Sequence, residues 1–394
     1  KQVISGANII DVAVLVIAAD KGIEVQTIEH LSIVKSLNVK RLLIVVNKID
    51  LVSPEVSSRL NKNLRDKLAI SNFEKWETTL ISAKEGTGIQ VLKKTLLSLL
   101  TPPVRDWAGS FRMNIDHSFP ISGIGTVLTG TVSRGKVKIG DSVEVSPDRA
   151  TGKVKFIQIF SSEQQFASAG DRVGIAVKDV RSGEVKRGDV LCSPGAMGPC
   201  KHVLTELTVD PKFKHSMKQK DFVHVGVGLK LIRGKITPFE YQNNRIIALE
   251  KLDDNEFNRV LIELDESVAC ETGDKILLVK MDLPPKSSRV VGSGMIKETL
   301  SEMPELFKAK ERTGVITSIL ENKRVKISGL FRTIDGANYY AGKILRISDG
   351  RKLKILKEEG RNGSVVAEID GEFNDGDSVT IKSHVLVRKS KGKD

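Results

Sequence analysis

Apolar runs and helical repeats alternate along the first hundred residues of the chain. Val12–Ala18 and Leu42–Val46 are almost wholly apolar, as in strands that are buried on both faces of a parallel sheet. Gln26–Leu37 lies between them and is predicted to be helical, and Thr79–Ile81 is predicted to be a further short strand. This alternation of strand and helix predicts a parallel sheet that is covered by helices on both sides.

Two more helices are predicted in the same region. Ser53 and Pro54 mark the start of the first, because serine caps helix N-termini and proline is accepted in the first turn. The apolar residues of this helix share one face: Val56, Leu60, Leu64 and Leu68. The next helix repeats at Ile89, Leu92, Leu96 and Leu99 and stops at Thr101-Pro102-Pro103. Lys1–Asn8 is expected to be the end of another helix.

After Pro103 the pattern changes to short strands of alternating apolar and polar residues. Gly-Asp turns precede these strands, as expected of hairpins in β-barrels, at Gly140-Asp141, Gly170-Asp171, Gly188-Asp189, Gly273-Asp274 and Gly376-Asp377. The segment Ser193–Ala196 is expected to mark a module boundary near residue 198. The charged stretch Glu302–Arg312 is predicted to be a short linker or helix. We therefore expect a multidomain α/β and all-β protein, with modules at residues 1–103, 104–198, 199–299 and 300–394.

The charge of the chain favours a polyanionic partner. The 394 residues carry a net charge of +13, with a pI near 9.5, so RNA is a better expectation than a membrane. The sequence contains no apolar run near the length of a membrane span and no signal-peptide pattern at its start. Aromatic residues make up only 5% of the chain, which argues against base stacking as the main mode of RNA binding. The three cysteines, Cys192, Cys200 and Cys270, lack metal-ligand spacing and are expected to be reduced thiols in a cytosolic protein.

The residues that follow the second strand have the chemistry of a guanine site. Asn47, Lys48 and Asp50 come at its carboxyl end, where open α/β sheets bind ligands. A carboxylate there accepts two hydrogen bonds, from the ring N–H and the exocyclic amine of guanine, whereas adenine would leave Asp50 unpaired. The stem of Lys48 can lie over the base, and Asn47 can tie neighbouring loops together. The alternative is a polar turn after a strand.

A second segment supports the guanine site. Ser82, Ala83 and Lys84 follow the next predicted strand, and small residues let backbone N–H groups approach a ligand closely. Asn-Lys-x-Asp followed by Ser-Ala-Lys, each closing a strand, resembles the base-specifying half of a GTPase. No Gly-x-x-x-x-Gly-Lys-Ser/Thr segment occurs in the sequence. In the family, the phosphate loop, the switch regions and the hydrolytic histidine precede the position of Lys1. We therefore expect a partial P-loop GTPase domain in an N-terminally incomplete record. The chain as printed should not hydrolyse GTP, and the intact protein should.

Two further segments indicate the class of GTPase. Asp116–Val132 resembles the first β-barrel domain of translational GTPases, and Asp20-Lys21-Gly22 with Gln26–His30 matches the same class. Over essentially the whole chain, the best likeness is to the archaeal selenocysteine-specific elongation factors. Lys280–Pro285, leading to Arg289, is similar to that branch, and so is an all-β fourth module. Where archaeal members have Gly-His-Gly, this chain has Gly292-Ser293-Gly294, which removes an imidazole.

The resemblance implies a fold, an activity and partners. It implies a G domain, two translation-factor β-barrels and a fourth small β-barrel that could contact RNA, together with the basic end Arg388–Lys393. GTP and GDP with Mg²⁺ are the implied cofactors, the Mg²⁺ bound through residues upstream of Lys1. The implied activity is delivery of selenocysteinyl-tRNA to the ribosome at a recoded UGA codon by a cytoplasmic monomer. An mRNA selenocysteine-insertion hairpin, or a protein that binds it, is a further implied partner.

The family's aminoacyl pocket maps onto Asp116, His117 and Arg172. A selenol ionises more readily than a thiol, whose pKa is about 8.5, so the cargo is an anion at neutral pH while its serine precursor is neutral. A cationic pocket would therefore discriminate by charge. Arg172 supplies a permanent charge, and Asp116 could orient His117 or keep it protonated. The alternatives are a solvated turn arginine, a surface histidine and a turn-capping aspartate.

Two other functions remain open from the sequence. A related GTPase could carry initiator or ordinary elongator tRNA, although such relatives usually lack the fourth module. The gamma subunit of the initiation factor also typically carries a cysteine-rich knuckle that is absent from this sequence. A non-enzymatic RNA-binding scaffold would fit if no phosphate loop preceded Lys1.

Overall fold

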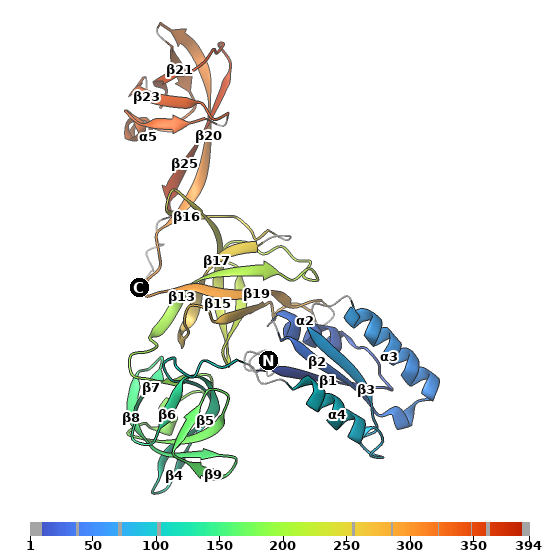
Figure 1. Cartoon of the computed structure of the whole chain (residues 1–394). Coiled ribbons are helices and arrows are strands. Elements are labelled where there is room, and N and C mark those ends of the chain that lie inside the picture. Colours follow the sequence, from blue (N-terminus) through green and yellow to red (C-terminus); the bar gives the residue numbers. More distant parts are fainter. Residues whose placement is uncertain are drawn as a thin grey trace. The chain divides into compact units, whose positions relative to one another are not determined.

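The structure is a computed structural model in which the chain forms two compact units (Figure 1). Unit 1 lies within residues 1–238 and 250–303, and unit 2 lies within residues 239–249 and 304–394. The residues described are 10–36, 39–69, 73–100, 104–253, 257–284, 287–321, 323–347, 349–359 and 363–387. The expected helix end at Lys1–Asn8, the stop at Thr101–Pro103 and the basic end at Arg388–Lys393 lie outside these residues, as does Leu37.

Unit 1 begins with the predicted parallel sheet. Its strands are β1 (Val12–Ala18), β2 (Arg41–Asn47) and β3 (Lys75–Leu80), in that order and all parallel. Helix α2 (Val25–Ser36) connects β1 to β2, α3 (Pro54–Ala69) connects β2 to β3, and α4 (Ile89–Leu99) follows β3. Strand and helix alternate as the sequence predicts.

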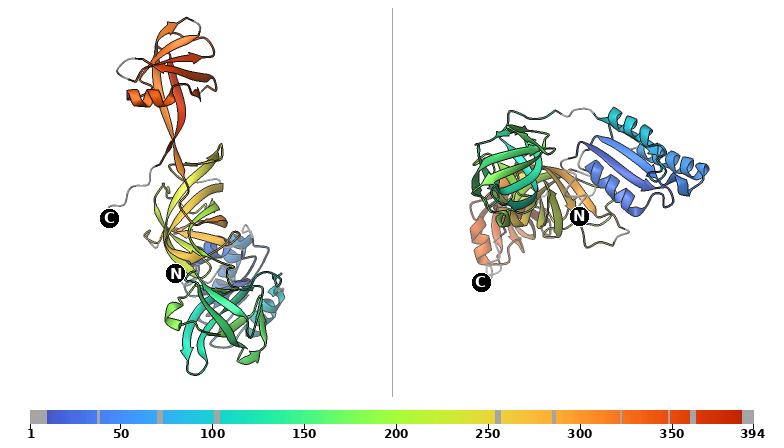
Figure 2. Two further views of the ribbon diagram at one scale, coloured as in Figure 1. Left: turned by 90° about the vertical axis from the view of Figure 1, so that its left-hand side faces the viewer. Right: turned by 90° about the horizontal axis from the view of Figure 1, so that it is seen from below.

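Helices cover both faces of this sheet (Figure 2). The side chains of Leu42 and Ile44 pack with α2 and α3 on one face. Leu43 and Val45 pack with α4 on the other. Because β2 is buried on both faces, its uninterrupted apolar run is explained by its central place in the sheet.

The first barrel of unit 1 follows the α/β domain. Six strands close into a ring in the order β11-β5-β4-β12-β7-β8, with β8 pairing back to β11. They are β4 (Arg112–Ile121), β5 (Gly125–Arg134), β7 (Ser142–Ser146), β8 (Ala150–Ile159), β11 (Arg172–Lys178) and β12 (Val190–Cys192). Three short strands complete this module: β6 (Lys136–Lys138), β9 (Ser162–Gln164) and β10 (Phe166–Ser168). Its core is an apolar cluster that includes Met113, Ile115 and Leu128.

The second barrel also closes through six strands. Their order is β14-β18-β19-β13-β17-β15, with β14 pairing back to β15. They are β13 (Pro199–Val209), β14 (Phe222–Val227), β15 (Lys230–Gln242), β17 (Phe257–Ala269), β18 (Lys275–Val279) and β19 (Val290–Leu300). At Gly294 a Cβ atom would lie 1.8 Å from the carbonyl oxygen of Glu206. Glycine is therefore required there by the close approach of β13 and β19.

One turn geometry recurs throughout the β modules. In each predicted Gly-Asp turn the glycine has a positive φ, from 89° to 107°. The aspartate carboxylate accepts a hydrogen bond from the backbone N–H three residues earlier, as Asp171 does from Ser168 at 2.8 Å. A sixth such turn, at Lys220-Asp221, was not predicted from the sequence, because a lysine with φ 70° stands in the place of the glycine.

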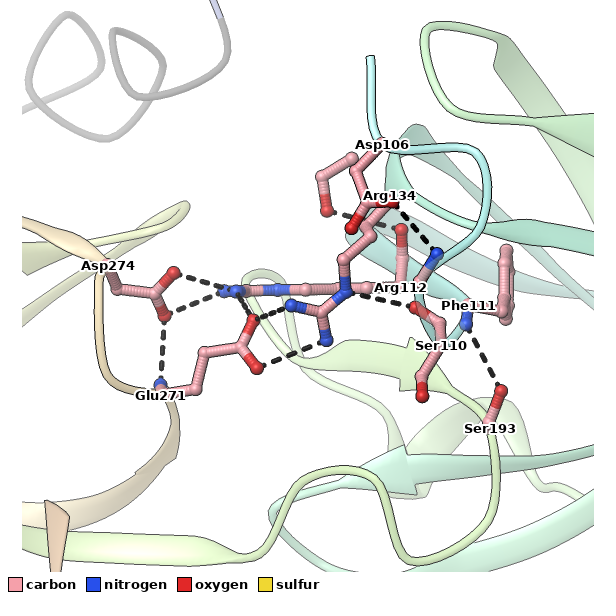
Figure 3. Close-up of polar contacts among 10 residues, drawn as sticks. Asp106, Ser110, Phe111, Arg112, Arg134, Ser193, Glu271 and Asp274 are labelled. Carbon is pink, nitrogen blue, oxygen red and sulfur yellow. Dashed lines mark hydrogen bonds and ion pairs between the residues drawn. The ribbon is translucent and has the colours of Figure 1, made fainter.

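The two barrels are joined by a partly buried ion-pair cluster (Figure 3). The Arg112 side chain from β4 is only 9% exposed and pairs with Asp274 and Glu271 of the second barrel. Arg134 on β5 also binds Glu271, with Nη1–Oε1 and Nη2–Oε2 distances of 2.8 and 3.1 Å. The positive charge of Arg112 is thus matched by two carboxylates, and their interaction with it raises the pKa of Arg112 although burial opposes its charge.

Unit 2 is a third, smaller β-barrel. Its strands are β16 (Arg245–Ala248), β20 (Leu306–Leu320), β21 (Arg324–Ser328), β22 (Ile344–Arg346), β23 (Lys352–Glu358), β24 (Val365–Ile369) and β25 (Ser378–Leu386). They follow the order β16-β20-β21-β24-β23-β22, and β25 pairs with β20. A bridge between Ile347 and Ile381 joins the end of β22 to β25. Helix α5 (Ile334–Tyr340) packs against the core through Ala337 and Tyr340.

The prediction of a linker or helix at Glu302–Arg312 is wrong from Leu306 onward. This segment enters β20 at Leu306, and Phe307–Val315 pairs continuously with β25. The charged side chains misled the prediction because most of them are exposed on the strand, while its stability comes from backbone pairing to β25.

Candidate functional site

The two predicted guanine-binding loops are tied together by one side chain. Strand β2 ends at Asn47, and Lys48 has a left-handed backbone conformation with φ 65°. The Asn47 Oδ1 atom accepts hydrogen bonds from the backbone N–H of Lys48 at 2.8 Å and from that of Ala83 at 3.0 Å. The loops after β2 and β3 are therefore positioned relative to each other by Asn47.

Asp50 lies in a short 3-10 helix (Ile49–Leu51) beside the second loop. The Ser82 side chain is the main influence that holds the pKa of Asp50 below its ordinary value; desolvation opposes this, and Lys84 and Lys48 assist it. Ser82 itself is only 1% exposed, and its Oγ atom accepts a hydrogen bond from the N–H of Glu85. Asp50 is thus kept ionised, in the state that accepts hydrogen bonds from a base.

The second loop depends on a glycine that the sequence analysis did not single out. Gly88 has φ 77°, and a Cβ atom there would lie 2.3 Å from the carbonyl oxygen of Leu80. The backbone N–H of Ser82 donates to the carbonyl of Thr87 at 3.0 Å, which closes the loop that carries Ala83 and Lys84. In the sequence, this turn is indicated by the glycine that stands six residues after Ser82.

The three residues of the expected aminoacyl pocket meet on the first barrel. Asp116 and His117 lie on β4, and Arg172 begins β11. Arg172 Nη1 forms an ion pair with Asp116 Oδ2, and His117 Nδ1 lies 3.3 Å from Asp116 Oδ1. The Asp116 side chain is 14% exposed, whereas those of His117 and Arg172 are 73% and 51% exposed. The largely buried Asp116 carboxylate therefore contacts both exposed side chains, Arg172 and His117.

Thr129 on β5 completes this group. Its Oγ1 atom donates a hydrogen bond of 2.6 Å to Asp116 Oδ1. Burial disfavours the charged form of Asp116, but hydrogen bonds from Thr129 and Arg172, together with the Arg172 charge, lower its pKa below the ordinary value. Thr129 could have been found only from strand register, because it is paired with His117 across β4 and β5.

No metal centre accompanies these groups in the described ranges, where no three His, Cys, Asp or Glu side chains are arranged to hold a metal ion. Cys192, Cys200 and Cys270 are buried free thiols. Burial, together with the nearby Glu144 charge, raises the pKa of Cys192 to about 11. Within those same ranges, no helix is long and apolar enough to cross a membrane.

Comparison with known proteins decides the family. Residues 1–102 match the elongation factor Tu GTP binding domain, residues 125–192 match elongation factor Tu domain 2, and residues 200–299 match domain III of the archaeal selenocysteine-specific elongation factor. The selenocysteine-specific elongation factor of Methanocaldococcus jannaschii is 32% identical over 391 residues, which cover 97% of this chain and 82% of that protein. This chain belongs to the selenocysteine-specific elongation factors.

Solved structures of the family agree with this assignment. Translation elongation factor SelB from Methanococcus maripaludis, in its apo form, matches with a TM-score of 0.77 and 30% identity over 97% of this chain and 87% of that one. The same protein in complex with the GTP analogue GppNHp matches with a TM-score of 0.78 and 30% identity, over 97% and 86% of the two chains. The selenocysteine-specific elongation factors are translational GTPases, and the predicted combination of a G domain with translation-factor β-barrels is confirmed.

Proposed function

We propose that this protein is a GTP-dependent factor that binds selenocysteinyl-tRNA and delivers it to the ribosome at recoded UGA codons. The observation that carries the proposal is the Arg172–Asp116 ion pair on the first barrel, in a chain of this family. It supplies a fixed positive charge where the family resemblance expects an anionic cargo. Delivery to a ribosome implies a cytoplasmic location, and the protein is expected to act as a monomer.

The nucleotide site selects guanine through Asp50 in this proposal. The Asp50 carboxylate accepts the ring N–H and the exocyclic amine, while the backbone N–H of Lys84 faces the guanine carbonyl oxygen, since that of Ala83 donates to Asn47. The Asn47 amide holds both loops in place for these contacts. Mg²⁺ supplies charge neutralisation at the phosphates when bound, and no residue of the described chain is assigned to it.

The aminoacyl site selects selenocysteine through charge. The Arg172 guanidinium carries a positive charge, so an ionised selenol is attracted to it and a neutral serine hydroxyl is not. Asp116 fixes the guanidinium, and Thr129 fixes Asp116. His117, which is largely exposed, could donate a second hydrogen bond to the selenolate.

The first test is a comparison of two cargoes on the intact protein with GTP. Its affinity for selenocysteinyl-tRNA would be measured beside that for the same tRNA charged with serine, and we expect a strong preference for the selenocysteinyl form. Equal affinity would favour a paralogous translational GTPase that delivers another aminoacyl-tRNA, of initiator or elongator type. A pull-down with a selenocysteine-insertion mRNA hairpin, alone and with its binding protein, tests that partner separately.

A further inference from the structure

Arg172 directly follows one of the Gly-Asp turns of the first barrel. It is the first residue of β11, and the turn before it is made by Gly170 and Asp171. Gly170 has φ 107°, and the Asp171 carboxylate accepts the backbone N–H of Ser168 at 2.8 Å. The direction in which the Arg172 side chain begins is set by the backbone of this turn. Contacts that hold the turn therefore also position the Arg172 guanidinium.

The turn is contacted by the stretch of chain between the α/β domain and the first barrel, residues 104–110, which we call the connecting segment. The Nε1–H of Trp107 donates to the carbonyl oxygen of Ala169, with an Nε1–O distance of 3.3 Å. The Arg105 side chain packs over Gly170, where a Cβ atom would lie 3.4 Å from Arg105 Nε. Two side chains of the connecting segment thus contact the two residues that precede Asp171.

Backbone hydrogen bonds at Gly135 fix the connecting segment to the barrel. The N–H of Gly135 donates to the carbonyl of Asp106 at 2.7 Å, and the carbonyl of Gly135 accepts the N–H of Ala169 at 2.9 Å. A Cβ atom at Gly135 would lie 2.4 Å from the carbonyl oxygen of Gly109, so the two backbones approach too closely for another residue. Asp106, Gly135 and Ala169 are therefore joined by consecutive hydrogen bonds, and a shift of the connecting segment would displace the turn.

Arg105 also joins the connecting segment to the α/β domain. Its Nη2 atom lies 2.5 Å from Oδ2 of Asp11, the residue immediately before β1. The two side chains are 26% and 43% exposed, and an ion pair with this access to water contributes little to stability. The pair does, however, fix the Arg105 side chain in its place against Gly170.

Burial does not account for the tryptophan. Trp107 is 65% exposed, so its ring gains little from removal of apolar surface from water. Within the described residues, the polar contact of its side chain is the hydrogen bond to Ala169. The role that the geometry gives to this tryptophan is to hold the turn that precedes Arg172.

We propose that Trp107 and Arg105 are positioning residues for the aminoacyl pocket. They hold the turn at residues 169–171 so that the Arg172 guanidinium stays on Asp116, where it can bind an ionised selenol. Selection by charge requires the cation to be held to within about 0.5 Å by the residues around it. Neither Trp107 nor Arg105 has to touch the cargo for this. The inference rests on the proposed function and deepens it, because it names residues outside the pocket that determine its specificity.

The test measures the affinity of the intact protein with GTP for selenocysteinyl-tRNA and for the same tRNA charged with serine. Trp107→Phe keeps an aromatic ring and removes the N–H donor. We expect it to weaken selenocysteinyl-tRNA binding by about threefold to tenfold, the range for loss of one hydrogen bond, and to leave seryl-tRNA and GTP binding unchanged. Arg105→Ala should have the same selective effect. Urea unfolding should show nearly the parent's stability for both variants, because Trp107 is exposed and the Arg105 ion pair is open to water.

The matched control is Trp76→Phe, which makes the same change at the other tryptophan of the chain, on β3 of the α/β domain. It should leave the affinities for both cargoes unchanged, and a selective loss as large as that of Trp107→Phe would overturn the proposal. An unchanged affinity for selenocysteinyl-tRNA in Trp107→Phe or Arg105→Ala would overturn it for that residue. Equal losses for the two cargoes would show a merely structural role and also overturn it. A parent protein that binds both cargoes equally would instead reject the proposed function, and this inference with it.

Discussion

Arg112 of the first barrel and Asp274 of the second form a two-pronged ion pair, with Nη1–Oδ1 and Nη2–Oδ2 distances of 2.7 and 2.9 Å. Asp274 has a second task, because its Oδ2 atom accepts the backbone N–H of Glu271 in its own Gly-Asp turn. A turn of one barrel is therefore also the binding site for a side chain of the other.

Arg112→Ala should destabilise unit 1 by about 3–5 kcal/mol, because the partly buried Asp274 carboxylate loses its two hydrogen bonds from Arg112 and Glu271 is left with Arg134. Urea unfolding followed by circular dichroism measures the loss. Arg134→Ala is the matched control: its side chain is 27% exposed, forms its ion pair with Glu271 and donates to the Ser110 carbonyl, so its effect should be clearly smaller. An Arg112 variant as stable as the parent would show that the barrels are held by apolar contacts instead.

Asp50→Asn should weaken GTP binding and shift preference toward xanthosine triphosphate. The asparagine amide can donate to the additional ring oxygen of xanthine, whereas it repels the N–H groups of guanine. Competition between the two nucleotides on the intact protein measures the shift. Asp66→Asn, an exposed change on α3, should leave the preference unaltered, and unchanged selectivity in the Asp50 variant would reject the base-site assignment.

Gly88→Ala should lower the free energy of unfolding far more than Gly86→Ala does. Both glycines have similar positive φ values, 77° and 75°, but only at Gly88 does a Cβ meet the backbone, since nothing lies within 4 Å at Gly86. Gly86→Ala should lower the free energy of unfolding by about 1–2 kcal/mol through backbone strain alone. The Gly88 change should also displace Ser82 and Ala83 and weaken GDP binding in calorimetry. Similar GDP affinities in the two variants would contradict this account.

Arg172→Ala should abolish discrimination between selenocysteinyl- and seryl-tRNA and leave GTP affinity unchanged. The control Arg181→Ala removes a cation from the same barrel that is 87% exposed and approaches Glu184 at 3.8 Å. Tight selectivity in the Arg172 variant would argue that the cargo is recognised elsewhere.

Asp116 should contribute stability that depends on pH. Its pKa in the folded state lies below the ordinary value of 3.8. The contribution is therefore complete above pH ~3.8 and disappears as the pH falls through the folded-state pKa. Urea unfolding of parent and Asp116→Asn proteins from pH 7 downward should show a constant difference to about pH 4 and a shrinking one below it. A stability difference that grows on acidification would contradict a lowered pKa of Asp116 in the folded state.

Strand ends could be predicted from the sequence, but contacts between strands could not. Asn47 and Ser82 follow apolar runs that the sequence displays directly. Thr129 reaches Asp116 only because β4 and β5 have a particular register, with a bulge between Ile115 and His117. No periodicity within a single strand contains that information. Likewise, the turn at Lys220-Asp221 was missed because its conformation favours glycine, and the contacts of the surrounding barrel hold a lysine there.

If the proposed guanine site is correct, the hydrogen bonds of Asn47 also bear on release of the base. One amide oxygen holds the loop that begins at Lys48 and the loop that contains Ala83. The second of these loops is exposed from Ala83 to Gly86, so a partner can press on it without entering the nucleotide site. In the proposed guanine site, such a displacement would break the bond to Ala83 and weaken the contacts of both loops with the base. Nucleotide exchange could then be triggered from outside the pocket by moving four residues.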